Sequence, residues 1–177
     1  TYIEDGRSYI TRDRNQYDII YLSKVMTQAS ETLGYALSEN YIYTKEAYKA
    51  YLDHLNPGGT LAFILHGPND LGKATATLIS ILEERGIPRD QAAKYMTVIN
   101  STFEDGRSHN HGGANILMYP LLMVKNTPFT MEESKNIMDL AVKNKQTIYH
   151  LPLIHEHLAG ITPSVEKQSS FLVTDNY

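Results

Sequence analysis

Short apolar segments of strand length alternate with helix-length segments along this chain, and this alternation is the strongest constraint on its fold. Residues 17–22 (YDIIYL) and 60–65 (TLAFIL) are almost continuously apolar, which is typical of strands covered on both faces. Further strands are predicted at 95–100, 114–126 and 146–152. Because alternating strands and helices favour βαβ units, the sequence predicts an α/β fold, with a mostly parallel sheet and helices on both faces.

A helix that begins after Thr44 is predicted between the first two strands. Thr44 can cap it, and apolar side chains from Ala47 to Leu55 recur at helical spacing. The sequence NPGG at 56–59 is expected to end this helix, since proline and paired glycines do not sustain one.

Two more helices are predicted later in the chain. The segment HGPND follows the second strand, and we expect Asn69 or Asp70 to cap the next helix rather than His66 to contact a ligand. Thr130 and Glu133 have the spacing of a capping box, so a further helix is predicted from there to about residue 144.

Length and composition favour one domain over residues 1–177 and exclude some kinds of site. The net charge is −4, which argues against a nucleic-acid partner, because such proteins present a basic surface. The chain has no cysteine and therefore no disulfide, thiolate metal site or cysteine nucleophile. No apolar run reaches the roughly 20 residues that cross a bilayer.

The order of motifs along the chain resembles the spermidine synthase-like branch of the class I S-adenosylmethionine-dependent methyltransferase fold. The similar segments are EDGRSYI, YDIIYLS, ALSENYIYTKEAYKAYLDHLNPGGTLAF, VKNTPFTMEESKNIMDLA, YHLP and VTDNY. The resemblance is greatest to bacterial variants attached to a multi-helix membrane segment. It implies a Rossmann-like sheet that lacks its first strands, cut from a longer protein.

The same resemblance implies a nucleoside cofactor, S-adenosylmethionine or its decarboxylated form, bound in the longer protein. The residues implied to lie against its adenine are Glu4, Asp5, Gly6 and Arg7. A carboxylate can accept a hydrogen bond from the exocyclic amine, and glycine permits close approach of the backbone. No G-x-G-x-x-G loop occurs in the chain, so we expect no tightly bound cofactor in residues 1–177 alone.

Ser23 occupies the position at which aminopropyltransferases similar to this sequence carry an aspartate for the attacking amine. A serine cannot act as a carboxylate base near neutral pH, and the neighbouring Lys24 would repel a cationic amine. Two functions remain open. One is a transferase of methyl or aminopropyl groups with an unknown small-molecule acceptor, in which Ser23 would contact the cofactor. The other is a non-catalytic module that acts as a sensor or assembly element of a membrane protein.

The polar and aromatic block SENYIYT at 38–44 is the predicted substrate-binding segment. Glu39, Asn40 and Tyr43 could line an acceptor pocket beside the strand end. The alternative interpretation is structural, with Asn40 and Thr44 forming a turn and cap while Tyr43 packs.

The remaining expectations concern metals, partners and location. The histidine pairs at 109–111 and 155–157 lack a supporting carboxylate at metal-site spacing, so no metal site is expected. A sheet without its first strands leaves an exposed edge, which predicts a homodimer through that edge or through an apolar surface that normally packs on the absent half. The domain is expected to be cytoplasmic, with membrane attachment only through segments outside this sequence.

Overall fold

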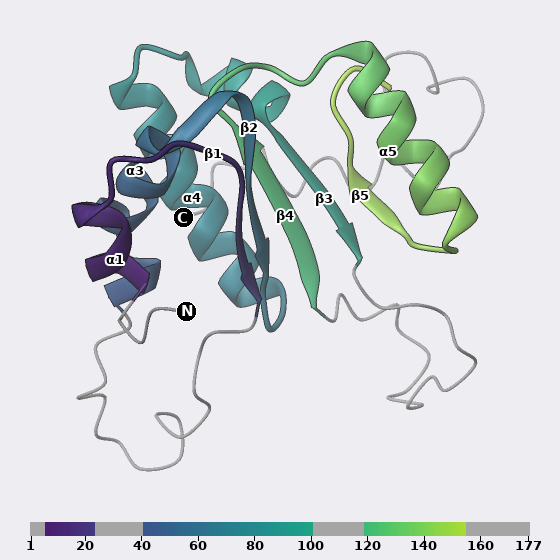
Figure 1. Cartoon of the computed structure of the whole chain (residues 1–177). Coiled ribbons are helices and arrows are strands. Elements are labelled where there is room, and N and C mark those ends of the chain that lie inside the picture. Colours follow the sequence, from purple (N-terminus) through teal and green to yellow (C-terminus); the bar gives the residue numbers. More distant parts are fainter. Residues whose placement is uncertain (1–5, 24–40, 101–118, 155–177) are drawn as a thin grey trace.

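The computed structural model describes residues 6–23, 41–100 and 119–154 (Figure 1). Its elements in chain order are α1 (Gly6–Arg12), β1 (Tyr17–Ser23), the 3-10 helix η1 (Tyr41–Tyr43), α3 (Lys45–Asp53), β2 (Leu55–Ile64), α4 (Pro68–Glu84), the 3-10 helix η2 (Arg89–Tyr95), β3 (Met96–Asn100), β4 (Pro120–Lys125), α5 (Met131–Lys143) and β5 (Ile148–His150).

The strands form one five-stranded mixed sheet in the order β1-β2-β4-β3-β5. Only β1 and β2 pair in parallel; the β2–β4, β3–β4 and β3–β5 pairs are antiparallel. The α/β fold is therefore confirmed, but the prediction of a mostly parallel sheet is wrong. The reason is that β4 returns between β2 and β3 and runs against both, whereas β1, β2 and β3 share one direction.

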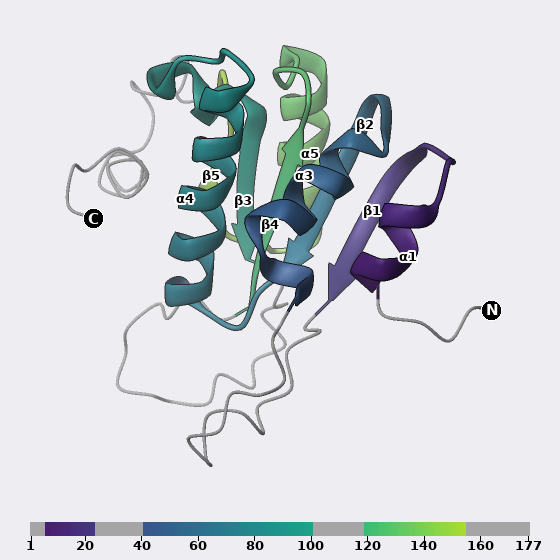
Figure 2. The same cartoon turned by 90° about the vertical axis from the view of Figure 1, so that its left-hand side faces the viewer.

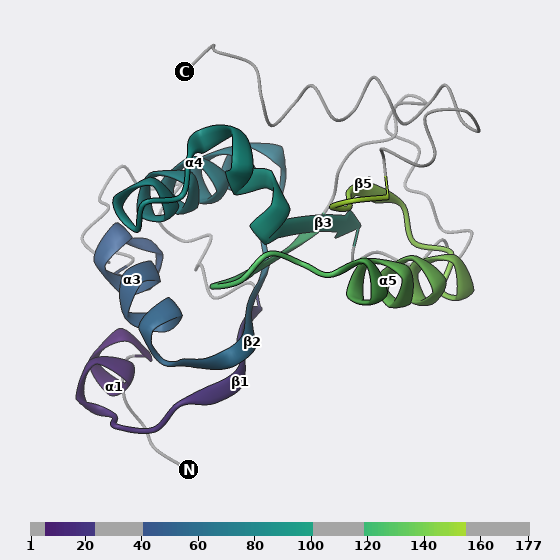
Figure 3. The same ribbon diagram turned by 90° about the horizontal axis from the view of Figure 1, so that it is seen from above.

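Helices lie on both faces of this sheet. The helices α1, α3 and α4 lie on one face, called the inner face here, and α5 lies on the opposite, outer face (Figures 2 and 3). The main core fills the space between the inner face and α3 and α4. Its fully or nearly fully buried members include Tyr48, Leu52, Leu61, Phe63, Leu78, Leu82, Val98, Leu122 and Val124.

Local signals placed two helix starts correctly. Thr44 caps α3 by accepting a hydrogen bond from the Ala47 backbone N–H at 3.2 Å. Thr130 and Glu133 form the predicted capping box at the start of α5.

Two other boundaries differ from the predictions. The helix α3 ends at Asp53, and the NPGG segment belongs to β2, where a side chain on Gly59 would meet the Tyr17 carbonyl oxygen at 2.8 Å. The helix α4 begins at Pro68 after Gly67, with no side-chain cap. Neither Asn69 nor Asp70 caps it, because proline is already suited to the first helical position.

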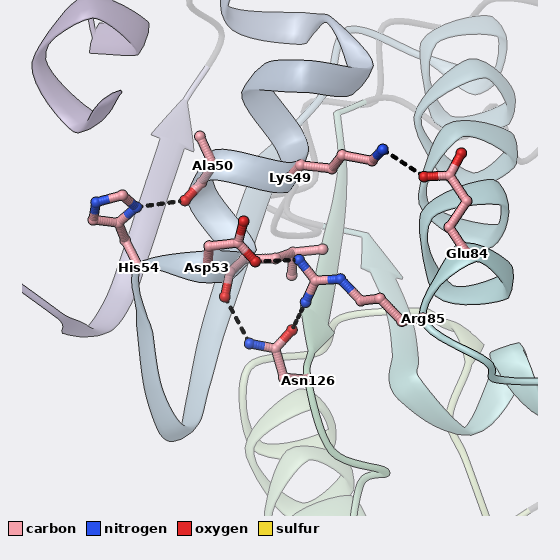
Figure 4. Close-up of polar contacts among 8 residues, drawn as sticks. Lys49, Ala50, Asp53, His54, Glu84, Arg85 and Asn126 are labelled. Atoms are coloured by element: carbon pink, nitrogen blue, oxygen red, sulfur yellow. Dashed lines mark hydrogen bonds and ion pairs between the residues drawn. The ribbon is translucent and has the colours of Figure 1, made fainter. Parts of the chain in front are cut away.

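A group of polar contacts ties α3, α4 and β4 together at the end of the sheet where β4 finishes (Figure 4). Arg85 donates to Asp53 at 2.6 Å and to the side-chain oxygen of Asn126 at 2.7 Å. Asn126 in turn donates to the Leu52 carbonyl oxygen at 2.6 Å. These contacts satisfy a carbonyl at the end of α3 and fix the spacing of the inner layer.

Glu84 makes stability depend on pH in the acid range. Hydrogen bonds from Lys45 and Lys49, each at 2.5 Å, lower the pKa of Glu84 from 4.5 to about 2. A lowered folded-state pKa means that the ion pairs stabilise the fold fully above pH 4.5 and that this contribution is lost as the pH falls toward 2. We expect Glu84→Gln to be less stable than the wild type near neutral pH, with the difference vanishing through this window.

Urea denaturation across that pH range measures the effect. The matched control is Glu83→Gln on the same helix turn, since Glu83 makes no ion pair with any described residue. A difference in stability between the wild type and Glu84→Gln that is the same at all pH values would contradict the role given to the ion pairs of Glu84.

Candidate functional site

The candidate site is the edge of the sheet where β1, β2 and β3 end, called the carboxyl edge here. Its described residues include Ser23, residues 64–66 and Asn100. The amino end of α1 lies near the end of β1 at this same edge (Figures 1 and 2). Open α/β sheets bind ligands at this kind of edge, because loops and helix ends converge there.

Two of the predicted cofactor-binding residues, Gly6 and Arg7, form the first turn of α1. A side chain on Gly6 would touch only the Cγ2 atom of Ile42, at 3.9 Å, so packing among the described residues does not demand glycine there. The pKa of Glu46 is lowered by hydrogen bonds from its own backbone N–H and from Thr44, and further by the charge of Arg7. Arg7 therefore lies near the start of α3. Glu4 and Asp5 fall outside the described residues.

Ser23 is the exposed last residue of β1 and lies opposite Ile64 of β2 in the register. At this position of the carboxyl edge the strand therefore carries a hydroxyl group and not a carboxylate. A hydroxyl can donate and accept hydrogen bonds, but it carries no charge with which to hold an ammonium group.

Tyr43 is the described member of the predicted substrate-binding set; Glu39 and Asn40 fall outside the described residues. Its ring centroid lies 6.4 Å from that of Phe63 and 6.5 Å from that of Tyr48, edge-on to the latter. Tyr43 packs partly buried against the main core. The structural interpretation, in which Tyr43 packs and Thr44 caps a helix, is thus present in the structure. Tyr43 directly follows Ile42, whose side chain lies near Gly6.

Burial keeps the neighbouring Tyr48 protonated. Desolvation is the largest cause that raises the pKa of Tyr48 far above 10, followed by Tyr43, Tyr51 and Asp70. The aromatic layer behind the carboxyl edge therefore presents an uncharged support and no phenolate.

The structure adds His66 and Tyr119 to the carboxyl edge, which sequence reasoning did not bring together. Their ring centroids lie 6.3 Å apart in an edge-on arrangement. The Nε2 atom of His66 is buried and has no hydrogen-bond partner among the described residues. The backbone of Tyr119 is left-handed, with a φ of 55°. Residues other than glycine seldom adopt this conformation, and those that do are frequently found at functional sites. The signal in the sequence was a histidine directly after a strand.

Metal binding has no support in the described part of the chain. No group of three or more histidine, aspartate or glutamate residues able to hold a metal ion occurs there. The two histidine pairs at 109–111 and 155–157 lie outside the described residues.

Comparison with known proteins finds a likeness in structure. No family model matches the sequence, and no curated protein matches it. A crystal structure of a probable spermidine synthase from Corynebacterium glutamicum matches with a TM-score of 0.52 and 17% sequence identity. The fold of this chain resembles that of the probable spermidine synthase. The resemblance inferred from the motifs is thereby confirmed at the level of the fold.

The extent of this match matters for function. It covers 90% of this chain but 51% of the solved chain, so this chain spans about half the length of its structural relative. At this identity the likeness establishes the fold and leaves catalysis open. Among the described helices, none has the length and apolar character needed to cross a membrane.

Proposed function

We propose that this chain forms part of a transferase domain that holds the nucleoside of S-adenosylmethionine, or of its decarboxylated form, at the carboxyl edge. The observation that carries the proposal is the convergence of the amino end of α1 with the parallel ends of β1 and β2 (Figure 1). The similarity in fold to a probable spermidine synthase supports it.

The described residues offer fitting partners for such a group. Gly6 leaves the backbone of α1 open to close approach, since a side chain there would meet only Ile42. The unpaired Nε2 atom of His66 is a buried polar group at the same edge, and such groups in native proteins are usually satisfied by a ligand or water. Glu4, Asp5, Arg7 and Ser23 complete the proposed cofactor set. A bound sulfonium compound would supply an alkyl group activated for transfer.

The acceptor is proposed to be a small molecule other than a simple diamine. Glu39, Asn40 and Tyr43 are the proposed acceptor-binding residues, with Tyr43 held by the aromatic layer on Phe63 and Tyr48. Ser23 provides no negative charge for an ammonium group, so the usual route of aminopropyl transfer to putrescine lacks its base.

Nuclear magnetic resonance tests cofactor binding even at low affinity. We expect millimolar S-adenosylmethionine or its decarboxylated form to shift the amide signals of Gly6, Arg7 and Ser23. Residues at the opposite edge, such as Asn126, should not respond, because they are separated from the site by the length of the strands. Unchanged signals at the carboxyl edge, or shifts confined to the opposite edge, would contradict the proposal.

A charge substitution tests the role assigned to Ser23. The variant Ser23→Asp is expected to gain binding of putrescine, a dication, relative to the wild type, measured by the same amide shifts. The matched control is Gln16→Asp, which adds the same charge at an exposed position before the opposite end of β1. Equal putrescine binding by both variants would show a general charge effect and would contradict the inference that the missing carboxylate at Ser23 disfavours a diamine acceptor.

A second candidate function is a non-catalytic module that keeps the fold as a sensor or assembly element. The absence of a carboxylate at Ser23 favours it. This candidate function predicts that neither form of the cofactor shifts the amide signals of residues at the carboxyl edge. It also predicts that Ser23→Asp gains no putrescine binding.

A further inference from the structure

His66 differs from the other two histidines of the described residues in what its ring contacts. The Nε2 atom of His54 faces the Asp13 carbonyl oxygen at 3.0 Å, and that of His150 faces the Ala93 carbonyl oxygen at 2.8 Å. The Nε2 atom of His66 is buried and has no hydrogen-bond partner among the described residues. A buried ring nitrogen of this kind is unfavourable unless a ligand or water completes its hydrogen bond.

The end of β2 gathers the described side chains of the candidate site around His66. Phe63 supports the ring of Tyr43, and Ile64 lies opposite Ser23 of β1. His66 follows Ile64 by two residues, so its backbone lies roughly 8 Å from that of Ser23, given about 7 Å for two residues along a strand and about 4.8 Å between strands. Tyr43, Ser23 and His66 therefore surround the end of a single strand.

Tyr119 lies on the other side of His66. The pairing of β2 with β4 continues one residue beyond β2, because the Leu65 N–H donates to the Pro120 carbonyl oxygen at 3.0 Å. Tyr119 thus lies opposite His66, with the two rings edge-on. A left-handed backbone such as that of Tyr119 persists only where the surrounding structure holds it. The aromatic neighbour of His66 is therefore a fixed part of the carboxyl edge.

We propose that the Nε2 atom of His66 accepts the hydroxyl proton of an uncharged phenol, which is the acceptor of the transferred alkyl group. This inference rests on the proposed function, since it names the acceptor class and the base of that same site. An uncharged acceptor fits an edge at which Ser23 provides no negative charge for an ammonium group. An aromatic acceptor fits the rings of Tyr43 and Tyr119, because aromatic rings pack favourably edge-on or offset against one another.

The transfer step balances with His66 as the base. A phenol that gives its hydroxyl proton to the Nε2 atom of His66 uses an oxygen lone pair to form the new C–O bond. The C–S bond of the sulfonium donor breaks, and its electron pair stays on the sulfur of the resulting thioether. The imidazolium of His66 then returns the proton to solvent. Histidine suits this role because imidazole takes up protons near neutral pH.

Asp70 is the alternative base near His66 in the described part of the chain. It lies in the first turn of α4, directly after the His66 loop. Its charge acts on Tyr48, whose pKa it helps to raise, and a carboxylate is a much weaker base than an imidazole. Asp70→Asn is therefore the matched control, and it should leave proton uptake from a phenol unchanged.

The absorbance of para-nitrophenol tests the proton transfer, because its anion absorbs visible light and its neutral form does not. At a pH where the free compound is largely un-ionised, the wild type should raise the ionised fraction severalfold. The variant His66→Gln can form a hydrogen bond but cannot take up a proton, so it should abolish the rise. Asp70→Asn should retain it.

Nuclear magnetic resonance of the histidine ring nitrogens tests the contact in the wild type, without a substitution. Millimolar para-nitrophenol should shift the Nε2 signal of His66. Its methyl ether para-nitroanisole, which lacks the hydroxyl proton, should not. The Nε2 signals of His54 and His150 should stay in place, because these atoms already face carbonyl oxygens.

Three results would overturn the proposal. The first is an ionised fraction that the wild type leaves unchanged. The second is a rise in that fraction that persists in His66→Gln or is lost in Asp70→Asn. The third is an equal shift of the His66 signal by para-nitrophenol and para-nitroanisole.

The amide shifts that S-adenosylmethionine induces at Gly6 and Arg7 separate this proposal from the proposed function, because they require no acceptor. If those shifts occur while para-nitrophenol leaves His66 unchanged, cofactor binding stands and the role of His66 is wrong. If para-nitrophenol is ionised by His66 while S-adenosylmethionine shifts no signal, the phenol site stands and the proposed function is wrong.

Discussion

Replacing Phe63 with alanine is expected to lower the free energy of unfolding by about 3–5 kcal/mol. Phe63 lies near the carboxyl end of β2 with no exposed surface. Its ring centroid lies 4.9 Å from that of Tyr48 and 6.4 Å from that of Tyr43. Truncation would remove the contacts of a whole ring and leave a cavity between the sheet and α3, which the rigid neighbours cannot fill completely.

The loss should reach the candidate site because Phe63 supports Tyr43. Urea denaturation gives the change in stability, and the amide shifts induced by S-adenosylmethionine near Tyr43 give the effect on the site. The control is Leu140→Ala on α5, where the side chain is 58% exposed, and the expected change is within about 0.5 kcal/mol. A loss below about 1 kcal/mol for Phe63→Ala would contradict the core assignment.

Replacing Glu133 with alanine is the second substitution with a large expected effect, a loss of about 2–4 kcal/mol. Glu133 forms an ion pair with Lys125, whose side chain is 4% exposed. Lys125 also lies 5.3 Å from the centre of the Phe129 ring. Removing the carboxylate would leave a buried ammonium group without its counter-charge and would also break the capping box with Thr130 at the start of α5.

The pKa of Glu133 agrees with a charged pair. Burial acts to raise the pKa of Glu133, but the hydrogen bonds from Lys125 and from the Thr130 backbone outweigh it and leave the pKa lowered. The carboxylate is therefore ionised at neutral pH. We estimate less than the full effect of a buried pair, because the Glu133 side chain is 38% exposed.

Two further variants separate the buried charge from the loss of the side chain. The neighbouring Glu132→Ala should change stability by no more than about 0.5 kcal/mol, since Glu132 is exposed. The double variant Lys125→Met with Glu133→Gln should recover most of the stability lost in Glu133→Ala, because it leaves no unpaired charge. A double variant as unstable as Glu133→Ala would show that the ion pair is not the cause.

More of the secondary structure than of the candidate site could be predicted from the sequence. The strand predicted at 17–22 and the caps at Thr44 and Thr130 are present in the structure, because apolar runs and capping hydrogen bonds act within a few residues. The sequence allows two roles for Tyr43, and its packing on Phe63 depends on how η1 meets β2. His66 and Tyr119 come together only because β2 and β4 pair, with Ile64 opposite Leu121.

The amino-acid sequence sets the approximate positions of the main strands and of the helices α3, α4 and α5, the α/β class, and the presence of Ser23 rather than a carboxylate at the end of β1. These properties follow from residue spacing and local hydrogen bonds, which each segment carries with it. The tertiary structure alone decided the direction of β4, its insertion between β2 and β3 and the resulting mixed sheet. An apolar strand has the same alternation of side chains in either direction, so the choice depends on which neighbour it contacts after the chain has folded.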